Sequence, residues 1–83
     1  MQSERLNVCG REVIRVRGEL NLSQEQLAVK CQLAGWDVSR DIIANIELGR
    51  RAVNDLELSV FARVLNTPIE ALYPRKIRAR LPR

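Results

Sequence analysis

The sequence predicts a compact all-α domain made of five short helices. Apolar residues recur at three- and four-residue spacing through most of its 83 residues, and no stretch alternates with period two. Serine, threonine and asparagine precede the apolar segments at positions typical of helix N-caps. A chain of this length makes one small domain, near the lower end of what folds alone around a single core.

The first helix is expected over residues 9–20, and the second from Ser23 to about Leu33. Ser23 and Gln26 have the spacing of a capping box, in which each side chain satisfies a free backbone amide. The residues expected to face the core are Val13, Val16 and Leu20 in the first helix, and Leu27, Ala28 and Cys31 in the second.

A third helix is expected over about residues 39–48. Ser39 is its N-cap, and Gly49 stands where a C-terminal glycine belongs. Its apolar face consists of Ile42, Ile43 and Ile46.

The break before this helix, Gly35-Trp36-Asp37, contains the only tryptophan of the chain. We expect Trp36 to fold back on Leu33 and Ile42 and to brace the turn, as a hydrophobic staple does ahead of an N-cap. The alternative is that Trp36 contacts DNA or a partner.

The fourth helix begins at the capping-box spacing of Asn54 and Glu57. A short fifth helix is expected after Thr67, with Thr67 as its cap and Pro68 at its first position. Pro74 then ends it. The apolar residues of the two helices are Leu58, Phe61, Ala62 and Leu65 in the fourth, and Ile69, Leu72 and Tyr73 in the fifth.

Charge divides the chain into a helical body and a basic tail. Residues 74–83 carry five basic residues and no acid, whereas residues 1–73 carry nine basic and ten acidic residues. We therefore divide the chain into a polar N-terminal segment, 1–8, a folded domain, 9–73, and a flexible basic tail, 74–83. Because the body is close to neutral, its net charge is weak evidence for nucleic-acid binding.

The composition argues against several classes of protein. There are no histidines and only two cysteines, so a four-ligand zinc site and the commonest general base are both missing. No glycine-rich phosphate loop is present, and we expect no enzymatic activity, metal or cofactor. Cys31 falls at helical spacing from Leu27 and is expected in the core. The N-terminus has no signal-peptide pattern and no segment is apolar enough to span a membrane, so a soluble cytoplasmic domain is expected.

Two strings resemble a known family: Leu22-Ser-Gln-Glu-Gln-Leu-Ala28 and Ile46-Glu-Leu-Gly-Arg-Arg51. They are similar to the second helix and the recognition-helix end of the phage-repressor helix-turn-helix family (Cro/CI, or XRE). The matching order continues with Arg17, Phe61-Ala62, Leu65 and Thr67 to Leu72, so the resemblance covers about residues 11–73. The spacing between Ala28 and Ile46 is longer than usual for the family. A subset with an extended Gly-Trp-Asp turn resembles this chain more closely.

The resemblance implies a lambda-repressor-like DNA-binding domain whose third helix enters the major groove. It assigns base readout to the outward residues Ser39, Arg40, Asp41, Ala44 and Asn45. It assigns DNA phosphate contacts to Gln24, Arg50 and Arg51. The alternative for all of these is an ordinary solvated surface.

The resemblance also implies a buried ion pair between Arg17 and Glu47 that ties the first helix to the end of the third. The alternative is that both side chains lie at the surface.

Together these features indicate a sequence-specific transcription regulator, with repression the expected effect. The expected partners are double-stranded DNA with a palindromic operator and a second copy of the chain. An antitoxin or a restriction-modification controller would share the fold. From other classes, a protein-interaction adaptor without DNA readout and an enzyme accessory domain stay open.

Overall fold

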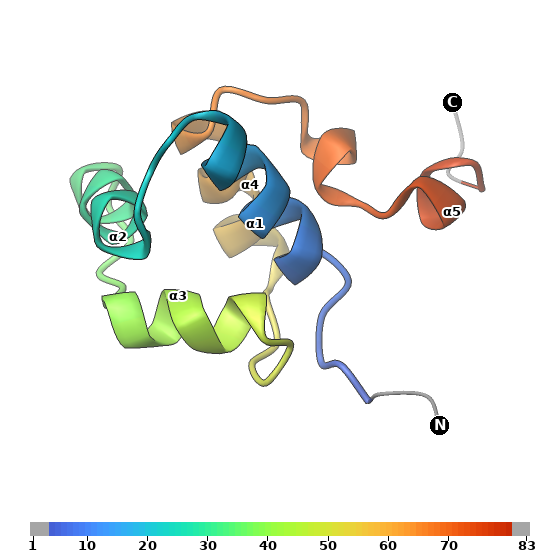
Figure 1. The fold of residues 1–83 in the computed structure, drawn as a ribbon, viewed down its shortest axis with the longest axis horizontal. Coiled ribbons are helices and arrows are strands. Elements are labelled where there is room, and N and C mark those ends of the chain that lie inside the picture. Colours follow the sequence, from blue (N-terminus) through green and yellow to red (C-terminus); the bar gives the residue numbers. More distant parts are fainter. Residues whose placement is uncertain (1–3, 81–83) are drawn as a thin grey trace.

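Four α-helices form the body of the domain, in the order that the sequence predicts (Figure 1). The computed structural model describes residues 4–80, and no residue in that range lies in a strand. The predicted all-α fold is therefore confirmed. The helices are α1, Gly10–Glu19; α2, Gln24–Leu33; α3, Arg40–Glu47; and α4, Asp55–Val64.

Side-chain caps begin three of these helices where the sequence places them. Ser23 and Gln26 form the predicted capping box of α2, and Asn54 and Glu57 form that of α4. The Ser39 hydroxyl accepts a hydrogen bond from the Ile42 amide at 3.2 Å and caps α3. Each cap satisfies amides that have no partner within the helix.

The helices α1 to α4 all end in the same way, with a left-handed residue after the last turn. At the end of α3 the Arg50 amide bonds the Asn45 carbonyl at 2.8 Å, and the Gly49 amide bonds the Ile46 carbonyl at 3.0 Å. This is the Schellman pattern, which satisfies carbonyls that the helix leaves free. The left-handed position is held by residues that tolerate a positive φ, namely Asn21, Gly35, Gly49 and Asn66.

The predicted fifth helix is a short 3₁₀ helix, η1, Ile69–Leu72, and its expected threonine cap is absent. Thr67 instead donates its backbone amide to the Ala62 carbonyl at 3.0 Å, in the Schellman turn of α4. Pro68 takes the N-cap position, with no side-chain cap. Pro74 holds Tyr73 in an extended conformation, so the segment closes after one turn.

Part of the predicted basic tail forms a further helical turn, α5, Arg75–Arg78. In the view of Figure 1 this turn lies at the far right, whereas α3 lies at the lower left. Residues 81–83 of the predicted tail and residues 1–3 of the predicted N-terminal segment lie outside the described residues. No described helix is long and apolar enough to cross a membrane.

The core lies between α1, α2, α3 and α4, with Leu72 of η1 closing one side. Three apolar residues expected to pack lie outside it: Leu20 is 46% exposed, Ile69 is 41% exposed, and Leu33, expected against Trp36, is 84% exposed. Leu20 follows the last residue of α1, and Leu33 is on the outward side of α2, four residues after the exposed Val29. The largest side chains that are fully buried include Phe61, Leu27, Ile43, Ile46, Leu65 and Leu72.

The N-terminal segment packs against the end of α3, a contact that the sequence analysis did not predict. Asn7 donates to the Ile46 carbonyl at 2.9 Å and to the Arg51 carbonyl at 2.8 Å, while its side-chain oxygen accepts from the Gly10 amide. Gly10 needs its lack of a side chain, because an added Cβ would collide with the Ile46 carbonyl oxygen. Arg5 reaches across to the Glu47 carbonyl at 2.9 Å. The start of α1 and the end of α3 are therefore joined through the backbone.

Candidate nucleic-acid interface

The outward face of α3 carries the residues expected to read bases. Arg40 and Asp41 in the first turn lie four positions before Ala44 and Asn45 respectively, which makes these side chains neighbours along one side of the helix. Arg40, Asp41 and Asn45 are exposed, and Ala44 is half-buried. The opposite face is anchored, because Ile43 and Ile46 are fully buried. The helix is thus fixed to the core on one side and presents a polar surface on the other.

Arg40 and Asp41 form an exposed ion pair, with Arg40 Nη1 at 3.2 Å from Asp41 Oδ1. Their side chains are 56% and 86% exposed, so water screens the pair and it contributes little to stability. The guanidinium can therefore leave the carboxylate for another acceptor at small cost. Ser39 differs from these residues, since its hydroxyl already accepts the capping hydrogen bond of α3.

The buried carboxylate of Glu47 joins α3 to α1 and α2. Arg17 donates to it from Nε at 2.7 Å and from Nη2 at 3.0 Å, and Gln24 donates from Nε2 at 2.9 Å. The Glu47 residue is 4% exposed. Arg17 also donates from Nη1 to the Leu22 carbonyl at 2.8 Å. This network sets the position of α3 relative to α1 and to the first turn of α2.

The three side chains expected at DNA phosphates differ in how they are held. Arg50 is exposed, at the C-terminal end of α3. Gln24 is half-buried, and one of its two side-chain N–H donors is used by Glu47. Arg51 makes a bidentate pair with Glu57, at 2.9 and 3.0 Å. This hydrogen bonding raises the pKa of Arg51 and lowers the pKa of the Glu57 carboxyl from its ordinary value.

Trp36, expected to brace the turn, packs across it with partners that differ from those expected. Its ring meets Phe61 of α4 edge-on, with centroids 5.1 Å apart and planes at 76°. The Arg51 guanidinium lies over it, 5.9 Å from the ring centroid. Ile42 is half-buried against the same core, whereas Leu33 points to solvent and takes no part. The tryptophan therefore packs inward across the turn, because a large buried ring of α4 is within its reach.

Two polar contacts and one apolar residue complete this turn. Gln32 donates to the Val38 carbonyl at 2.7 Å, and the Trp36 amide bonds the Cys31 carbonyl at 2.9 Å. Val38 itself is 1% exposed. Val38 was not predicted as a core residue. The signal that marks it is an apolar side chain directly before the Ser39 cap, the position where hydrophobic-staple residues lie.

The two cysteines, Cys9 and Cys31, are buried and unpaired. Burial raises the pKa of each thiol to about 11, which keeps both in the unreactive protonated form. Cys31 is fully buried, as predicted. Within residues 4–80 there is no cluster of His, Cys, Asp and Glu side chains able to hold a metal ion.

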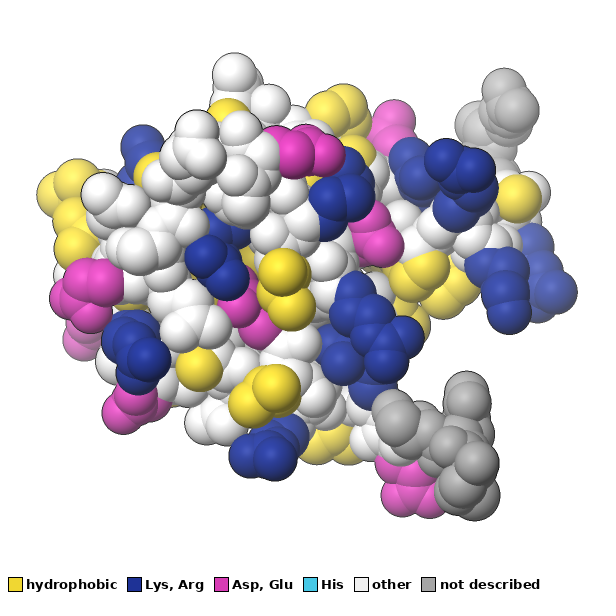
Figure 2. Space-filling model, in the orientation of Figure 1, with side chains coloured by type: hydrophobic (Ala, Val, Ile, Leu, Met, Phe, Trp, Pro, Cys, Tyr) yellow, Lys and Arg dark blue, Asp and Glu magenta, His cyan; other side chains and the backbone are white. Residues whose placement is uncertain are grey.

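The surface around α3 carries both signs of charge, as the lower left of Figure 2 shows. Lys and Arg side chains gather instead at the right of that view, over α5. On this face the basic side chains over α5 are thus on a different part of the surface from α3.

The arrangement of α2, the turn and α3 on a helical core defines a helix-turn-helix protein. A helix-turn-helix family model matches residues 13–72, which is most of the chain. The chain belongs to this family, the XRE-type DNA-binding transcription regulators, as the sequence predicts. The subset with an extended Gly-Trp-Asp turn stays a prediction.

Two solved structures are similar to this chain over most of their length. The DNA-binding domain of BldD is 27% identical, with a TM-score of 0.71, and the match covers 89% of this chain and 100% of that one. The restriction-modification controller protein C.AhdI from Aeromonas hydrophila is 25% identical, with a TM-score of 0.68, over 77% of this chain and 86% of that one. A comparison with curated proteins found no significant match.

Proposed function

We propose that this protein is a transcriptional repressor that reads a short DNA sequence through the major groove with α3. The observation that carries the proposal is the two-sided character of α3. Its buried face and the Glu47 carboxylate fix the helix, and its outward face offers Arg40 and Asn45 to a ligand. In the major groove an arginine pairs with guanine O6 and N7, and an asparagine pairs with adenine.

Asp41, Ala44 and Ser39 complete the proposed reading surface. A carboxylate accepts from the amino group of cytosine, and an alanine methyl packs on the methyl of thymine. Ser39 sits at the start of α3, where its side chain approaches the groove edge while it caps the helix.

Arg50 is the strongest candidate for a phosphate contact, because its exposed side chain follows the recognition helix directly. Gln24 keeps a second N–H donor for a phosphate at the first turn of α2, where the helix dipole favours an anion. Arg51 is the weaker candidate, since reaching a phosphate would require it to leave Glu57.

A homodimer on a palindromic operator fits this proposal. One helix of eight residues spans few base pairs, and two-fold symmetric half-sites about 34 Å apart would double the sequence read. Ile69 of η1, 41% exposed, is a candidate for the contact between copies. Sedimentation of the protein alone and with operator DNA tests the stoichiometry.

The deciding experiment uses DNA selected by the protein from a random pool, followed by anisotropy titrations with the selected duplex and with a scrambled one. Arg40→Ala should weaken binding to the selected duplex by about 5- to 150-fold, the 1–3 kcal/mol of a bidentate base contact, and bring its affinity close to that for scrambled DNA. Arg11→Ala removes the same charge from an exposed site on α1 and should leave the ratio of the two affinities unchanged. An Arg40→Ala protein that still prefers the selected duplex would refute the readout assignment.

A restriction-modification controller is the second candidate, favoured by the similarity to C.AhdI. The selected sequence distinguishes the two, since a controller should bind next to a restriction or methyltransferase gene and a phage-type repressor next to divergent phage genes. An adaptor role would instead give no selected sequence at all.

A further inference from the structure

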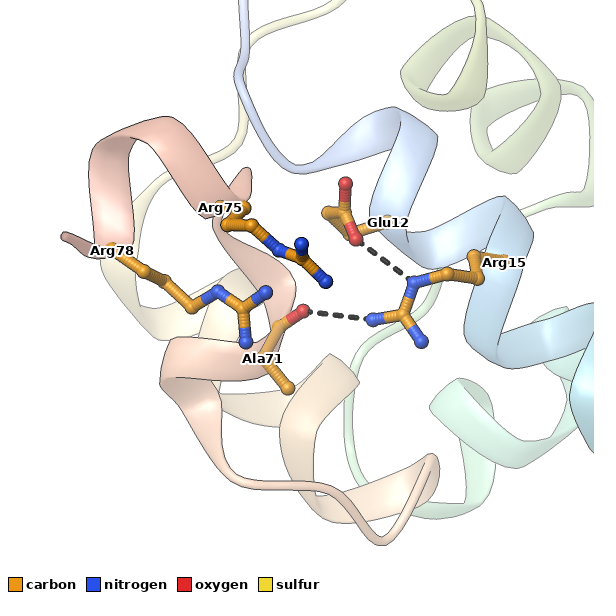
Figure 3. A pocket seen from close by; sticks show the side chains of 5 residues that line it. All are labelled: Glu12, Arg15, Ala71, Arg75 and Arg78. Carbon is orange, nitrogen blue, oxygen red and sulfur yellow. Dashed lines mark hydrogen bonds and ion pairs between the residues drawn. The ribbon is translucent and has the colours of Figure 1, made fainter.

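A cavity of about 460 Å³ lies between α1, η1 and α5, and arginines dominate its wall. It is lined by Glu12 and Arg15 of α1, Ala71 of η1, and Arg75 and Arg78 of α5. Figure 3 shows Arg75 and Arg78 extending from α5 toward α1 and η1, so that three guanidinium groups gather around one space. The size is within the range of small-molecule sites, about 300–1,000 Å³.

The charges around this cavity are not balanced. Three arginines face one glutamate, which leaves a net charge of +2. That glutamate is already engaged, because Glu12 Oε1 accepts from Arg15 Nε at 3.0 Å. Arg15 also donates to Glu19 at 3.1 Å and to the Ala71 carbonyl at 3.3 Å. Neither Arg75 nor Arg78 forms an ion pair with any residue of the described range.

One donor in the cavity wall is also unsatisfied. The Nε of Arg78 is shielded from solvent, and no group in residues 4–80 accepts a hydrogen bond from it. A buried N–H of a charged group without an acceptor costs free energy, and a bound anion would remove that cost. Gathering like charges in a partly enclosed space costs further free energy that an anion would offset.

We propose that this cavity is a binding site for a small molecule carrying a phosphate group, held by Arg75 and Arg78 of α5 with Arg15 of α1. Guanidinium groups offer planar pairs of donors that match phosphate oxygens, and they do so more specifically than lysine. The cavity is wider than a phosphate ion alone requires, so it has room for a molecule that carries the phosphate. This site is separate from the recognition face of α3, and it does not depend on the function proposed above.

The test uses inorganic pyrophosphate as the probe and follows the side-chain Nε–H signals of the arginines by NMR, with chloride at equal ionic strength as the reference. Saturable shifts at Arg75 and Arg78 support the site. The double variant Arg75→Gln/Arg78→Gln should bind the probe at least about 100-fold more weakly, since each charged hydrogen bond contributes about tenfold or more. Lys76→Gln/Arg80→Gln is the matched control, because it removes the same charge from positions of the same segment that do not line the cavity and should retain binding.

A third variant guards against misfolding as the explanation for lost binding. Glu12→Gln removes the only carboxylate of the wall and should tighten pyrophosphate binding, an effect that unfolding cannot imitate. Shifts that do not saturate, or equal losses in both double variants, would overturn the proposal and leave only diffuse attraction to a basic segment. A DNA affinity that falls in Arg75→Gln/Arg78→Gln but not in the control would overturn it too, because the phosphate held there would then belong to DNA.

Discussion

The Arg17–Glu47 pair offers a sharp quantitative test of how α3 is held. Arg17→Met keeps a long apolar stem but removes two donors from a carboxylate that is 4% exposed, and one from the Leu22 carbonyl. Removing one partner of a buried pair costs about 3–5 kcal/mol. A domain of this length has a free energy of unfolding of about 4–12 kcal/mol, so much of its stability depends on this guanidinium.

Urea unfolding followed by circular dichroism measures that loss. With a slope of about 1–1.5 kcal/mol per molar, the transition midpoint of Arg17→Met should fall by about 2–5 M, or the protein should be unfolded without urea. Arg11→Met makes the same chemical change at an exposed position of α1 and should cost about 0.5 kcal/mol or less.

A double variant shows whether the stranded charge is the cause. Arg17→Met/Glu47→Leu should be more stable than Arg17→Met, because a buried pair replaced by apolar side chains is often tolerated. A loss below about 1 kcal/mol in Arg17→Met, or a double variant less stable than the single one, would refute this account of how α3 is anchored.

Three further changes test other contacts. Glu57→Gln keeps the capping box but breaks the pair with Arg51, and should cost about 0.2–1 kcal/mol of stability at neutral pH. Because the pair lowers the pKa of Glu57, this cost should shrink as pH falls through the acid range. Thermal melts of both proteins at several pH values measure it, and a stability difference that does not change with pH would contradict the prediction. Trp36→Ala should lower the free energy of unfolding by about 2–3 kcal/mol, less than for a fully buried tryptophan. Urea titration measures the stability and a DNA titration measures the affinity, and unchanged stability with lost DNA binding would contradict the prediction. The thiol pKa values of Cys9 and Cys31 are about 11 in the fold against 9.0 unperturbed, so both residues favour folding below pH 9 and oppose it progressively as pH rises toward 11. Both thiols should also resist iodoacetamide until urea unfolds the chain, and mass spectrometry detects any earlier labelling.

Local signals in the sequence were sufficient for most of the helix boundaries. Caps such as Ser23 and Asn54 act on residues three positions away, so a short window of sequence contains the whole interaction. The 3₁₀ form of η1 was not predicted because the Thr67-Pro68 pair marks the start of a helix but not its type. In the structure Pro68, rather than Thr67, takes the N-cap position, and the Thr67 amide completes the turn that ends α4.

Contacts between distant segments were harder to predict. Arg5 and Asn7 bond backbone carbonyls of residues 46, 47 and 51, and no side-chain pattern marks a carbonyl as an acceptor. Trp36 was expected against Leu33, its neighbour in sequence, but Phe61 lies within reach only once α4 has packed. Glu47 is different, since the ion pair with Arg17 was expected from family resemblance rather than from the residues themselves.

The Glu47 network has a consequence for how this protein tolerates change in length. The network joins the start of α2 to the end of α3, at the ends of these helices that are remote from their connecting turn. The angle between the two helices is therefore held at both ends of the pair, by this network at one end and by Trp36 packed on Phe61 at the other. A residue gained or lost in 34–37 should therefore cost the stability that Trp36 supplies, while the Glu47 network still joins the far ends of the two helices.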